Sequence, residues 1–187
     1  MFLKFNRNNK LPKILFQFEQ KSVDSKGYSF TLRRANVEDI DILVHIEEAV
    51  YAGTAPWLLR DFLSELSRPN VRLYLVMERK GQVIGFAGVA YQRDQRDMHI
   101  TNIAIVPVWQ NKGLGTLMIN ELLDFSRQLG VDTMSLEARA SNRSAIMLYS
   151  RLGFEQSGIK KSYYIGDHED AISMAVSYTH LRAHETE

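Results

Sequence analysis

The sequence predicts a mixed α/β fold of the α+β kind, with about seven mostly antiparallel strands and about four helices. Residues 71–91 contain two alternating stretches around Lys80-Gly81, which is typical of a tight antiparallel hairpin. Residues 103–138 contain a strand, an amphipathic helix and a second strand, which predicts one central strand–helix–strand crossover. With 45% hydrophobic residues, a chain of 187 residues can bury one core of ordinary size. No second domain is required.

The first half of this domain is expected to contain four strands and two helices. Asn36 is a suitable helix N-cap, and Asp39 places a negative charge in the first turn, where the helix dipole favours it. An apolar stripe at helical spacing follows, formed by Ile40, Leu43, Ile46 and Val50. The expected elements are a strand at residues 30–34, helices from 36 to about 51 and from 56 to about 69, and strands at 71–78, 82–91 and 99–106.

The second half begins with the crossover helix. Its apolar positions recur at helical spacing, at Leu114, Met118, Leu122, Phe125 and Leu129. Gly130 is a natural C′ residue after this helix, and residues 133–138 return as a strand. Asn142 can cap a further helix that Gly153 closes, and the last strands fall near residues 154–164 and 171–176.

The turn before the crossover helix is the strongest candidate for a phosphate-binding site. It reads Gln110, Asn111, Lys112, Gly113, Leu114, Gly115 and Thr116. At a helix start several backbone N–H groups lack partners and the dipole is positive, so the main chain can bind a diphosphate if no Cβ blocks the approach. Lys112 adds a cation.

Other phosphate motifs fit this turn poorly, but the turn alone leaves alternatives. A Walker loop places its lysine after the second glycine, whereas Lys112 precedes Gly113. A dinucleotide fingerprint has a third glycine where this chain has Met118, although Glu137 lies near the distance of its acidic residue. A tight turn that binds no ligand is the remaining alternative.

Several strings resemble the GNAT acetyltransferase superfamily and, within it, the bacterial ribosomal-protein-alanine N-acetyltransferases. The turn at residues 110–115 resembles the superfamily's Q/R-x-x-G-x-G/A loop. The strings Leu-Glu-Ala-Arg-Ala-Ser-Asn at 136–142, Ala-Ile-Met-Leu-Tyr-Ser-Arg-Leu-Gly-Phe at 145–154, Tyr-Tyr at 163–164 and Glu-Asp-Ala-Ile-Ser-Met at 169–174 resemble the narrower group. Residues 46–48 and 51–57 match it as well, and the resemblance spans about residues 30–176.

This resemblance implies a single acetyltransferase domain at residues 28–176 that uses acetyl-coenzyme A as cosubstrate and no metal. It implies acetylation of the N-terminal alanine of a small-subunit ribosomal protein, with Glu137 as general base. The implied cofactor contacts are Ile103, Ala104, Ile105, residues 110–116, Asn142 and Tyr149, and the implied peptide contacts are Tyr51, Pro56, Trp57, Tyr163 and Tyr164. Ile165 replaces the family's usual proline after the tyrosines, so the sequence departs from the family beside the expected peptide contacts.

The residue types agree with acyl transfer, although each has a structural alternative. Glu137 alternates with Leu136 on a strand, and partial burial would raise its pKa toward the neutral range that suits a base. The pattern alone favours a surface carboxylate paired with Arg139. The Tyr149 hydroxyl can donate a proton to a leaving thiolate, or the ring can simply pack; Asn142 can contact the cofactor, cap a helix, or both.

Two further chemical points concern the oxyanion and the acceptor. A backbone N–H between residues 103 and 105 is the simplest donor to the thioester oxygen, because main-chain dipoles need no reorganisation. An N-terminal α-amine has a reference pKa near 8 and a lysine side chain one near 10.4, so the α-amine supplies far more neutral nucleophile at neutral pH.

Composition argues against several other classes of protein. The chain has no cysteine, so no cysteinyl intermediate can form, and its net charge of +1 gives no field to attract DNA. It has no run of eighteen apolar residues and no signal-peptide pattern, so we expect a cytoplasmic protein without a membrane partner. Only His180 and His184 stand at i, i+4 spacing, which is too few ligands to predict a metal site.

The two ends lie outside the resemblance. Residues 1–27 mix lysines with aromatic residues, which predicts either RNA contact or, with more weight, an extra element packed on the domain. Residues 177–187 form a polar tail that is a candidate for non-native sequence. Two alternative functions stay open: an acetyltransferase for a lysine or small-molecule amine, and a non-catalytic acyl-coenzyme A-binding regulatory module.

Overall fold

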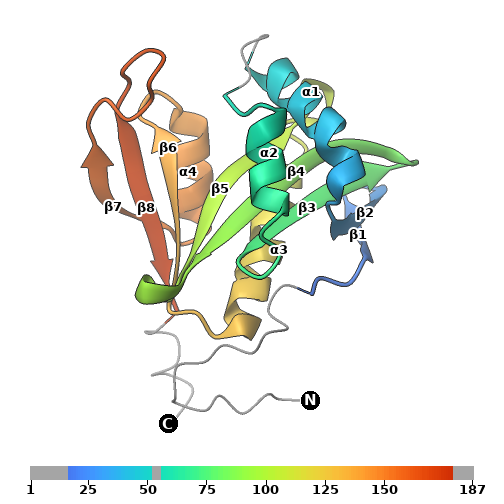
Figure 1. Ribbon diagram of the computed structural model, residues 1–187, viewed down its shortest axis with the longest axis horizontal. Helices are drawn as coiled ribbons and strands as arrows, with labels where there is room; N and C mark the ends of the chain where they lie inside the picture. The colour runs from blue at the N-terminus through green and yellow to red at the C-terminus, as the bar shows by residue number, and fades with distance from the viewer. Residues whose placement is uncertain (1–16, 52–55, 179–187) are drawn as a thin grey trace.

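One mixed sheet with helices on both faces forms the protein (Figure 1). The computed structural model describes residues 17–51 and 56–178. Within those ranges the sheet has eight strands in the order β1-β2-β3-β4-β5-β6-β8-β7. The strands are β1 Lys21–Ser25, β2 Tyr28–Arg34, β3 Arg72–Arg79, β4 Gln82–Gln92, β5 Asp97–Ile105, β6 Thr133–Arg139, β7 Glu155–Lys160 and β8 Ala171–Ser177. The helices are α1 Ile40–Val50, α2 Leu59–Leu66, α3 Leu114–Leu129 and α4 Arg143–Arg151, with short 3-10 turns η1 Val37–Asp39, η2 Arg93–Gln95 and η3 Pro107–Trp109.

The predicted fold class is confirmed, with one strand more than expected. All pairings are antiparallel except that of β5 with β6, and α3 makes the predicted crossover between these two strands. The additional strand is β1, which lies in the segment assigned to an N-terminal extension and pairs with β2. Val23 is its only large apolar residue, so a one-sided edge strand of this kind leaves almost no alternating pattern.

The C-terminal boundary of the domain also needs correction. Ser177 is the last residue of β8, and Tyr178 is 3% exposed, with its N–H donating to the Asp132 carbonyl oxygen at 2.9 Å. Both residues therefore belong to the domain and not to a tail. His180, His184 and the basic and aromatic residues before Gln17 lie outside the described residues.

Local caps formed as the sequence predicted. Asn36 accepts a hydrogen bond from the Glu38 N–H, and the Asp39 carboxylate accepts one from the Asn36 N–H, which completes a capping box. The first turn after this cap is the 3-10 turn η1, and α1 continues from it. Gly130 closes α3 at φ 68°.

The two faces of the sheet carry different helices. On β3, Leu73, Leu75 and Met77 pack into a core with α3 and α4, while Tyr74 and Val76 pack into a second core with α1 and α2. Figure 1 shows α1 and α2 in front of the sheet and α3 and α4 behind it. None of the helices in the described ranges is long and apolar enough to cross a membrane.

The sheet opens between its two parallel strands. β5 pairs with β6 only from Asp97 to Ile100, and Figure 1 shows the two strands diverging beyond their paired ends. At the same point the register between β4 and β5 shifts, because Val89 pairs with Ile100 and Gly88 with Asn102, leaving Thr101 as an extra residue. The bulge and the loss of pairing together create an opening through the sheet.

Candidate active site

A groove of about 470 Å³ lies at the start of α3, on the α3 and α4 side of the opening. Its lining residues are Ile105, Trp109, Gln110, Asn111, Gly113, Leu114, Gly115, Thr116, Asn142, Ser144, Ala145, Met147, Leu148 and Arg151. The predicted phosphate-binding turn therefore lines a real groove. Lys112 is the exception: its ammonium lies 5.8 Å from the centre of the Trp109 ring, and the residue does not line the groove. Arg151 of α4 supplies a cation that the sequence argument missed.

The two glycines of the turn, Gly113 and Gly115, have different roles. Gly113 is the N-cap of α3 with φ 82°, a left-handed conformation in which a side chain would be strained. Gly115 has an ordinary conformation, and a Cβ built there would meet only Leu148, at 3.7 Å. Since the fold itself does not require Gly115, its missing side chain keeps the groove open beside the unpaired N–H groups of the helix start. That cradle fits a diphosphate.

Neighbouring elements hold the turn in place. The Gln110 side-chain Nε2 donates to the Ile105 carbonyl oxygen at 2.9 Å, which ties the turn to the end of β5. From the β1–β2 hairpin, the Ser25 hydroxyl donates to the Lys112 carbonyl at 3.3 Å and the Lys26 ammonium to the Asn111 carbonyl at 3.4 Å. The extra strand β1 thus supports the groove from outside.

A second cavity, of about 190 Å³, lies at the opening itself. It is lined by Glu47, Tyr51, Pro56, Trp57, Ile100, Thr101, Asn102, Ile103, Leu136, Glu137, Ala138, Arg139, Asn142, Ala145, Tyr149 and Tyr164. Asn142 and Ala145 line both hollows, so the cavity and the groove adjoin at these residues. Two ligands that enter from opposite faces of the sheet can therefore meet there.

Backbone donors of β5 face this opening. The Val106 N–H donates to the Ile84 carbonyl of β4 at 2.9 Å, so Val106 points its backbone groups toward β4. Backbone groups alternate in direction along a strand, which turns the N–H groups of Ile105 and Ile103 toward the opening. The position of the predicted oxyanion donors is thus suitable.

Glu137 lines the cavity, but its electrostatic environment differs from the expected one. The His99 Nε2 atom lies 3.0 Å from one carboxylate oxygen, and the Lys160 ammonium donates to the other at 2.8 Å. The hydrogen bond from His99, more than that from Lys160, lowers the pKa of Glu137 to about 2, against the opposing effect of burial. The expectation that burial raises this pKa is wrong, and the partner expected from the pattern, Arg139, instead pairs with Asp167 and Glu169.

Tyr149 lines the cavity, and Asn142 lines both hollows. The Tyr149 side chain is buried, and burial raises the pKa of its hydroxyl to about 12, so the hydroxyl stays protonated at neutral pH. Its ring also packs against Phe154, with ring centres 5.9 Å apart. The Asn142 side-chain oxygen accepts from the Ala145 N–H at 3.1 Å, which confirms the cap of α4.

The residues expected to contact the peptide are partly brought together. Tyr51, Pro56, Trp57 and Tyr164 line the cavity, whereas Tyr163 does not. The Arg139 guanidinium stacks over the Tyr164 ring, 4.0 Å from its centre. Trp57 lies before α2, not within it, and its ring packs 5.5 Å from that of Phe62.

Glu47 is the main functional candidate that the sequence argument missed. It is 2% exposed, lines the cavity, and burial raises its pKa to about 7, partly offset by the nearby Asn102 amide. A signal was present in the sequence: Glu47 stands four residues after Leu43 and three before Val50, so it interrupts the apolar stripe of α1. Among the described residues there is no group of three or more side chains placed to hold a metal ion.

Comparisons with known proteins agree with this geometry. The sequence model of the acetyltransferase (GNAT) family matches residues 40–154. The ribosomal protein bS18-alanine N-acetyltransferase of Escherichia coli is 34% identical over 148 residues, covering 78% of this chain and 96% of the relative. The N-alpha-acetyltransferase RimI of Mycobacterium tuberculosis is 30% identical over 138 residues, covering 73% of this chain and 85% of the relative.

The fold comparison points to the same group. The crystal structure of the Escherichia coli ribosomal-protein-S18-alanine N-acetyltransferase matches with a TM-score of 0.71 and 33% identity, over 79% of this chain and 93% of that one. The overall fold is thus shared with an enzyme of known class. The chain belongs to the acetyltransferase (GNAT) family and is an acetyl-coenzyme A-dependent N-acetyltransferase.

Proposed function

We propose that this enzyme acetylates the N-terminal α-amine of a small-subunit ribosomal protein whose first residue is alanine. The relatives in Escherichia coli and Mycobacterium tuberculosis carry names that describe this kind of reaction. The observation that carries the proposal is the pair of adjoining hollows, because a cofactor groove on one face of the sheet meets a narrow cavity on the other. A chain terminus is slender enough to enter such a cavity.

The groove is proposed to hold acetyl-coenzyme A, which supplies an acetyl thioester when bound. The N–H groups at the start of α3 bind its diphosphate, and Arg151 adds positive charge. Gly115 leaves the space for this contact. The N–H groups of Ile103 and Ile105 face the opening, where they can hydrogen-bond the thioester oxygen as it gains charge.

Tyr149 is proposed to stabilise the departing thiolate by a hydrogen bond. Its hydroxyl keeps its proton at neutral pH and stands in the cavity beside the groove. A free thiol has a reference pKa near 8.5, so full proton transfer from this hydroxyl is uphill. Its contribution is therefore mainly a hydrogen bond to a charged sulfur, which corresponds to roughly 1.5–3 kcal/mol.

Glu137 is proposed to attract and orient the substrate. Its low pKa keeps it ionised throughout the physiological range, and both of its oxygens already accept hydrogen bonds or ion pairs. A carboxylate so strongly stabilised in its charged form is a poor proton acceptor. Its negative charge in the cavity nevertheless favours the arrival of a peptide ammonium group.

The test is acetylation of short peptides with varied first residues, followed by mass spectrometry. The wild-type enzyme should acetylate a peptide that begins like the ribosomal protein, with alanine first, faster than free polyamines or a peptide with a blocked N-terminus. Tyr149→Phe should lower kcat by about 10- to 100-fold while acetyl-coenzyme A affinity stays unchanged, since only one hydrogen bond is lost. Preference for the free amines would contradict the assignment of a protein N-terminus.

A further inference from the structure

A chain of four polar side chains starts at Glu137 and continues along β5 and β6, away from the cavity. The His99 Nε2 atom lies 3.0 Å from the Glu137 Oε2 atom, and the His99 Nδ1 atom lies 2.8 Å from the Ser135 hydroxyl oxygen. Ser135 in turn donates its hydroxyl proton to Asp97, which is 3% exposed. His99 thus has a hydrogen-bonding partner at each of its two ring nitrogens.

The buried end of this chain fixes the position of one imidazole proton. An ionised aspartate is an acceptor only, and Asp97 receives the hydroxyl protons of both Ser135 and Thr133. A serine hydroxyl has one proton to donate, so the Ser135 oxygen can only accept a hydrogen bond from the His99 Nδ1 atom. In a neutral His99 ring the single proton therefore lies on Nδ1, and the lone pair of Nε2 faces the Glu137 carboxylate.

The contact between His99 and Glu137 therefore requires a proton between the two side chains. Both facing atoms carry lone pairs, so the two residues bind this proton as a pair and titrate together. With the proton in place, the hydrogen bond from His99 is the largest cause of the low pKa of Glu137, about 2. When the pair loses the proton, the carboxylate loses this stabilisation and becomes a better proton acceptor. The weak basicity of Glu137 is thus a property of the protonated pair.

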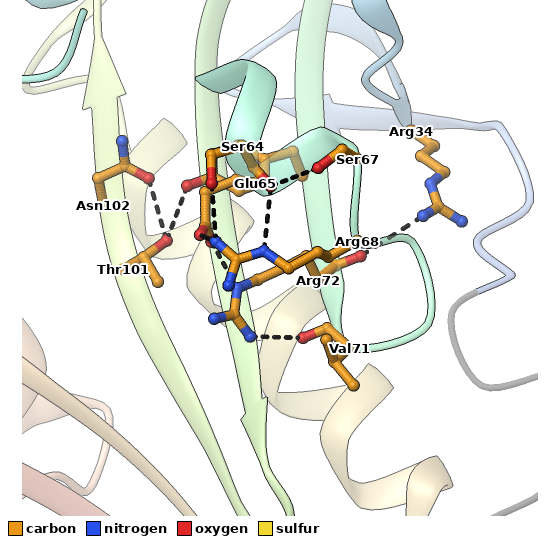
Figure 2. A network of polar contacts seen from close by, with 10 residues as sticks. Arg34, Ser64, Glu65, Ser67, Arg68, Val71, Arg72, Thr101 and Asn102 are labelled. Carbon is orange, nitrogen blue, oxygen red and sulfur yellow. Dashed lines mark hydrogen bonds and ion pairs between the residues drawn. The ribbon is translucent and has the colours of Figure 1, made fainter. Parts of the chain in front are cut away.

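Other charged groups near His99 are bound to partners of their own. Across β4, Ala90 pairs with His99 on one side and with Arg72 of β3 on the other. Arg72 forms an ion pair with Glu65 of α2 at 2.6 Å, and Figure 2 shows it donating to the Val71 carbonyl oxygen. Further ionisable groups on this side of the sheet are Glu47 of α1 beside Asn102, Arg139 of β6 with Asp167 and Glu169, Lys160 of β7 with Glu137, and the exposed Glu155 of β7. The nearby charges are thus largely balanced by their own partners.

We propose that His99 completes the proton acceptor of this enzyme: Glu137 takes a proton from the substrate's N-terminal ammonium and passes it to the His99 Nε2 atom. This inference rests on the proposed function and adds His99 as a positioning residue behind the carboxylate that meets the ammonium. The nitrogen lone pair freed by this transfer forms the C–N bond with the thioester carbon as the C–S bond breaks. The second nitrogen proton ends on the thiolate sulfur, and His99 later releases its proton to solvent.

The location of His99 suits this release. Glu137 lines the cavity and its side chain is 10% exposed, so a bound peptide covers it. His99 is not among the described residues that line the cavity, and its side chain is 18% exposed. A proton on His99 can therefore reach solvent while the peptide is still bound. Histidine is also the residue type whose reference pKa, near 6.5, allows it to take up and release a proton near neutral pH.

The first test is the pH profile of the single-turnover rate between pH 5 and 9, with an alanine-starting peptide at saturation. His99→Gln keeps a hydrogen-bond donor but cannot take up a proton, and His45→Gln removes an exposed histidine of α1 as the matched control. The wild-type rate should rise with pH as the pair loses its proton, and then level off. On this plateau His99→Gln should be about tenfold or more slower, because part of a general base is lost, and its rise with pH should disappear. His45→Gln should follow wild type at every pH.

The second test locates the imidazole proton in the wild-type protein. Nitrogen-15 NMR of the histidine rings distinguishes a protonated ring nitrogen from an unprotonated one. At the alkaline end of the titration, His99 should keep its proton on Nδ1 and have none on Nε2. The midpoint of this titration, measured with the peptide bound to the coenzyme A complex, should coincide with the midpoint of the single-turnover profile.

Two results would overturn the proposal. One is a His99→Gln profile that stays parallel to the wild-type profile, because a merely structural role would lower the rate equally at every pH. The other is a neutral His99 ring that carries its proton on Nε2, since such a ring is only a fixed donor to Glu137.

Two controls keep these outcomes distinct from other failures. Calorimetry should show unchanged acetyl-coenzyme A binding in His99→Gln; if the variant has lost its fold, the NMR result on wild type decides alone. If wild type acetylates only other amines, the proposed substrate fails, and the same profile measured with such an amine still tests the pair of Glu137 and His99.

Discussion

At the scale of single residues, two glutamates in one cavity have acquired opposite properties. Glu137 has two cationic or hydrogen-bonding partners and a pKa of about 2, whereas Glu47 is buried among apolar side chains and has a pKa of about 7. Hydrogen bonds from partner groups lower the pKa of Glu137, and desolvation by burial raises the pKa of Glu47. The residue that the family motif marks most clearly is therefore the weaker base of the two.

This difference predicts how stability depends on pH. The folded-state pKa of Glu47 lies above its ordinary value of 4.5, so its contribution to stability is fully present below pH 4.5 and is lost as pH rises through 7. Glu47→Gln should therefore be more stable than wild type at pH 8, by up to about 3 kcal/mol, and should show no such gain at pH 4.5. Urea unfolding at both pH values measures this. The control is Glu48→Gln, which removes the same charge from the exposed neighbouring residue. An equal change in the free energy of unfolding at the two pH values, or a stabilisation of the control as well, would show that burial of Glu47 is not the cause.

At the scale of elements, the two glycines of the turn at the start of α3 have different roles. Gly113 is required by its backbone conformation, whereas Gly115 is proposed to leave space for the ligand. Gly115→Ala should stabilise α3 slightly, because alanine is the better helix former by up to about 1 kcal/mol. The added Cβ meets only ordinary contacts in the protein but projects into the groove. Affinity for acetyl-coenzyme A should fall by about tenfold or more, as expected when a contact to a charged group is lost.

The matched control for this change is Gly158→Ala on β7. A Cβ added there meets nothing within 4 Å, and Gly158 does not line the groove. Thermal unfolding and calorimetry measure the two effects separately. If Gly115→Ala bound the cofactor as tightly as wild type does, the turn would be a structural feature and not a phosphate cradle.

Elements with strong local patterns were predictable from the sequence. The caps at Asn36 and Gly130, the hairpin at Lys80-Gly81 and the crossover around α3 each depend on residues within a few positions of one another. Strand β1 was missed because its pattern is weak. The bulge at Thr101 was not predictable, since it arises from the register between β4 and β5 and not from the residue itself.

At the scale of the whole molecule, the site depends on the place where β5 and β6 stop pairing. Helix α1 brings Glu47, and the segment before α2 brings Trp57, to one face of this opening, and α3 and α4 bring Gly115 and Tyr149 to the other. The glycine turn that lines the groove was predictable from the sequence because its residues are contiguous. The nearness of Glu47 to Asn102 was not predictable, because only the packing of α1 on the sheet brings these distant residues together.

We propose that the two hollows bring the thioester of acetyl-coenzyme A and a protein N-terminus together. The most direct test of this proposal is one alanine-starting peptide that also contains an internal lysine, incubated with enzyme and acetyl-coenzyme A and then sequenced by fragmentation in the mass spectrometer. We expect a single acetyl group on the α-amine of the first residue. An acetyl group on the lysine side chain, or an unmodified peptide while other amines are acetylated, would contradict it.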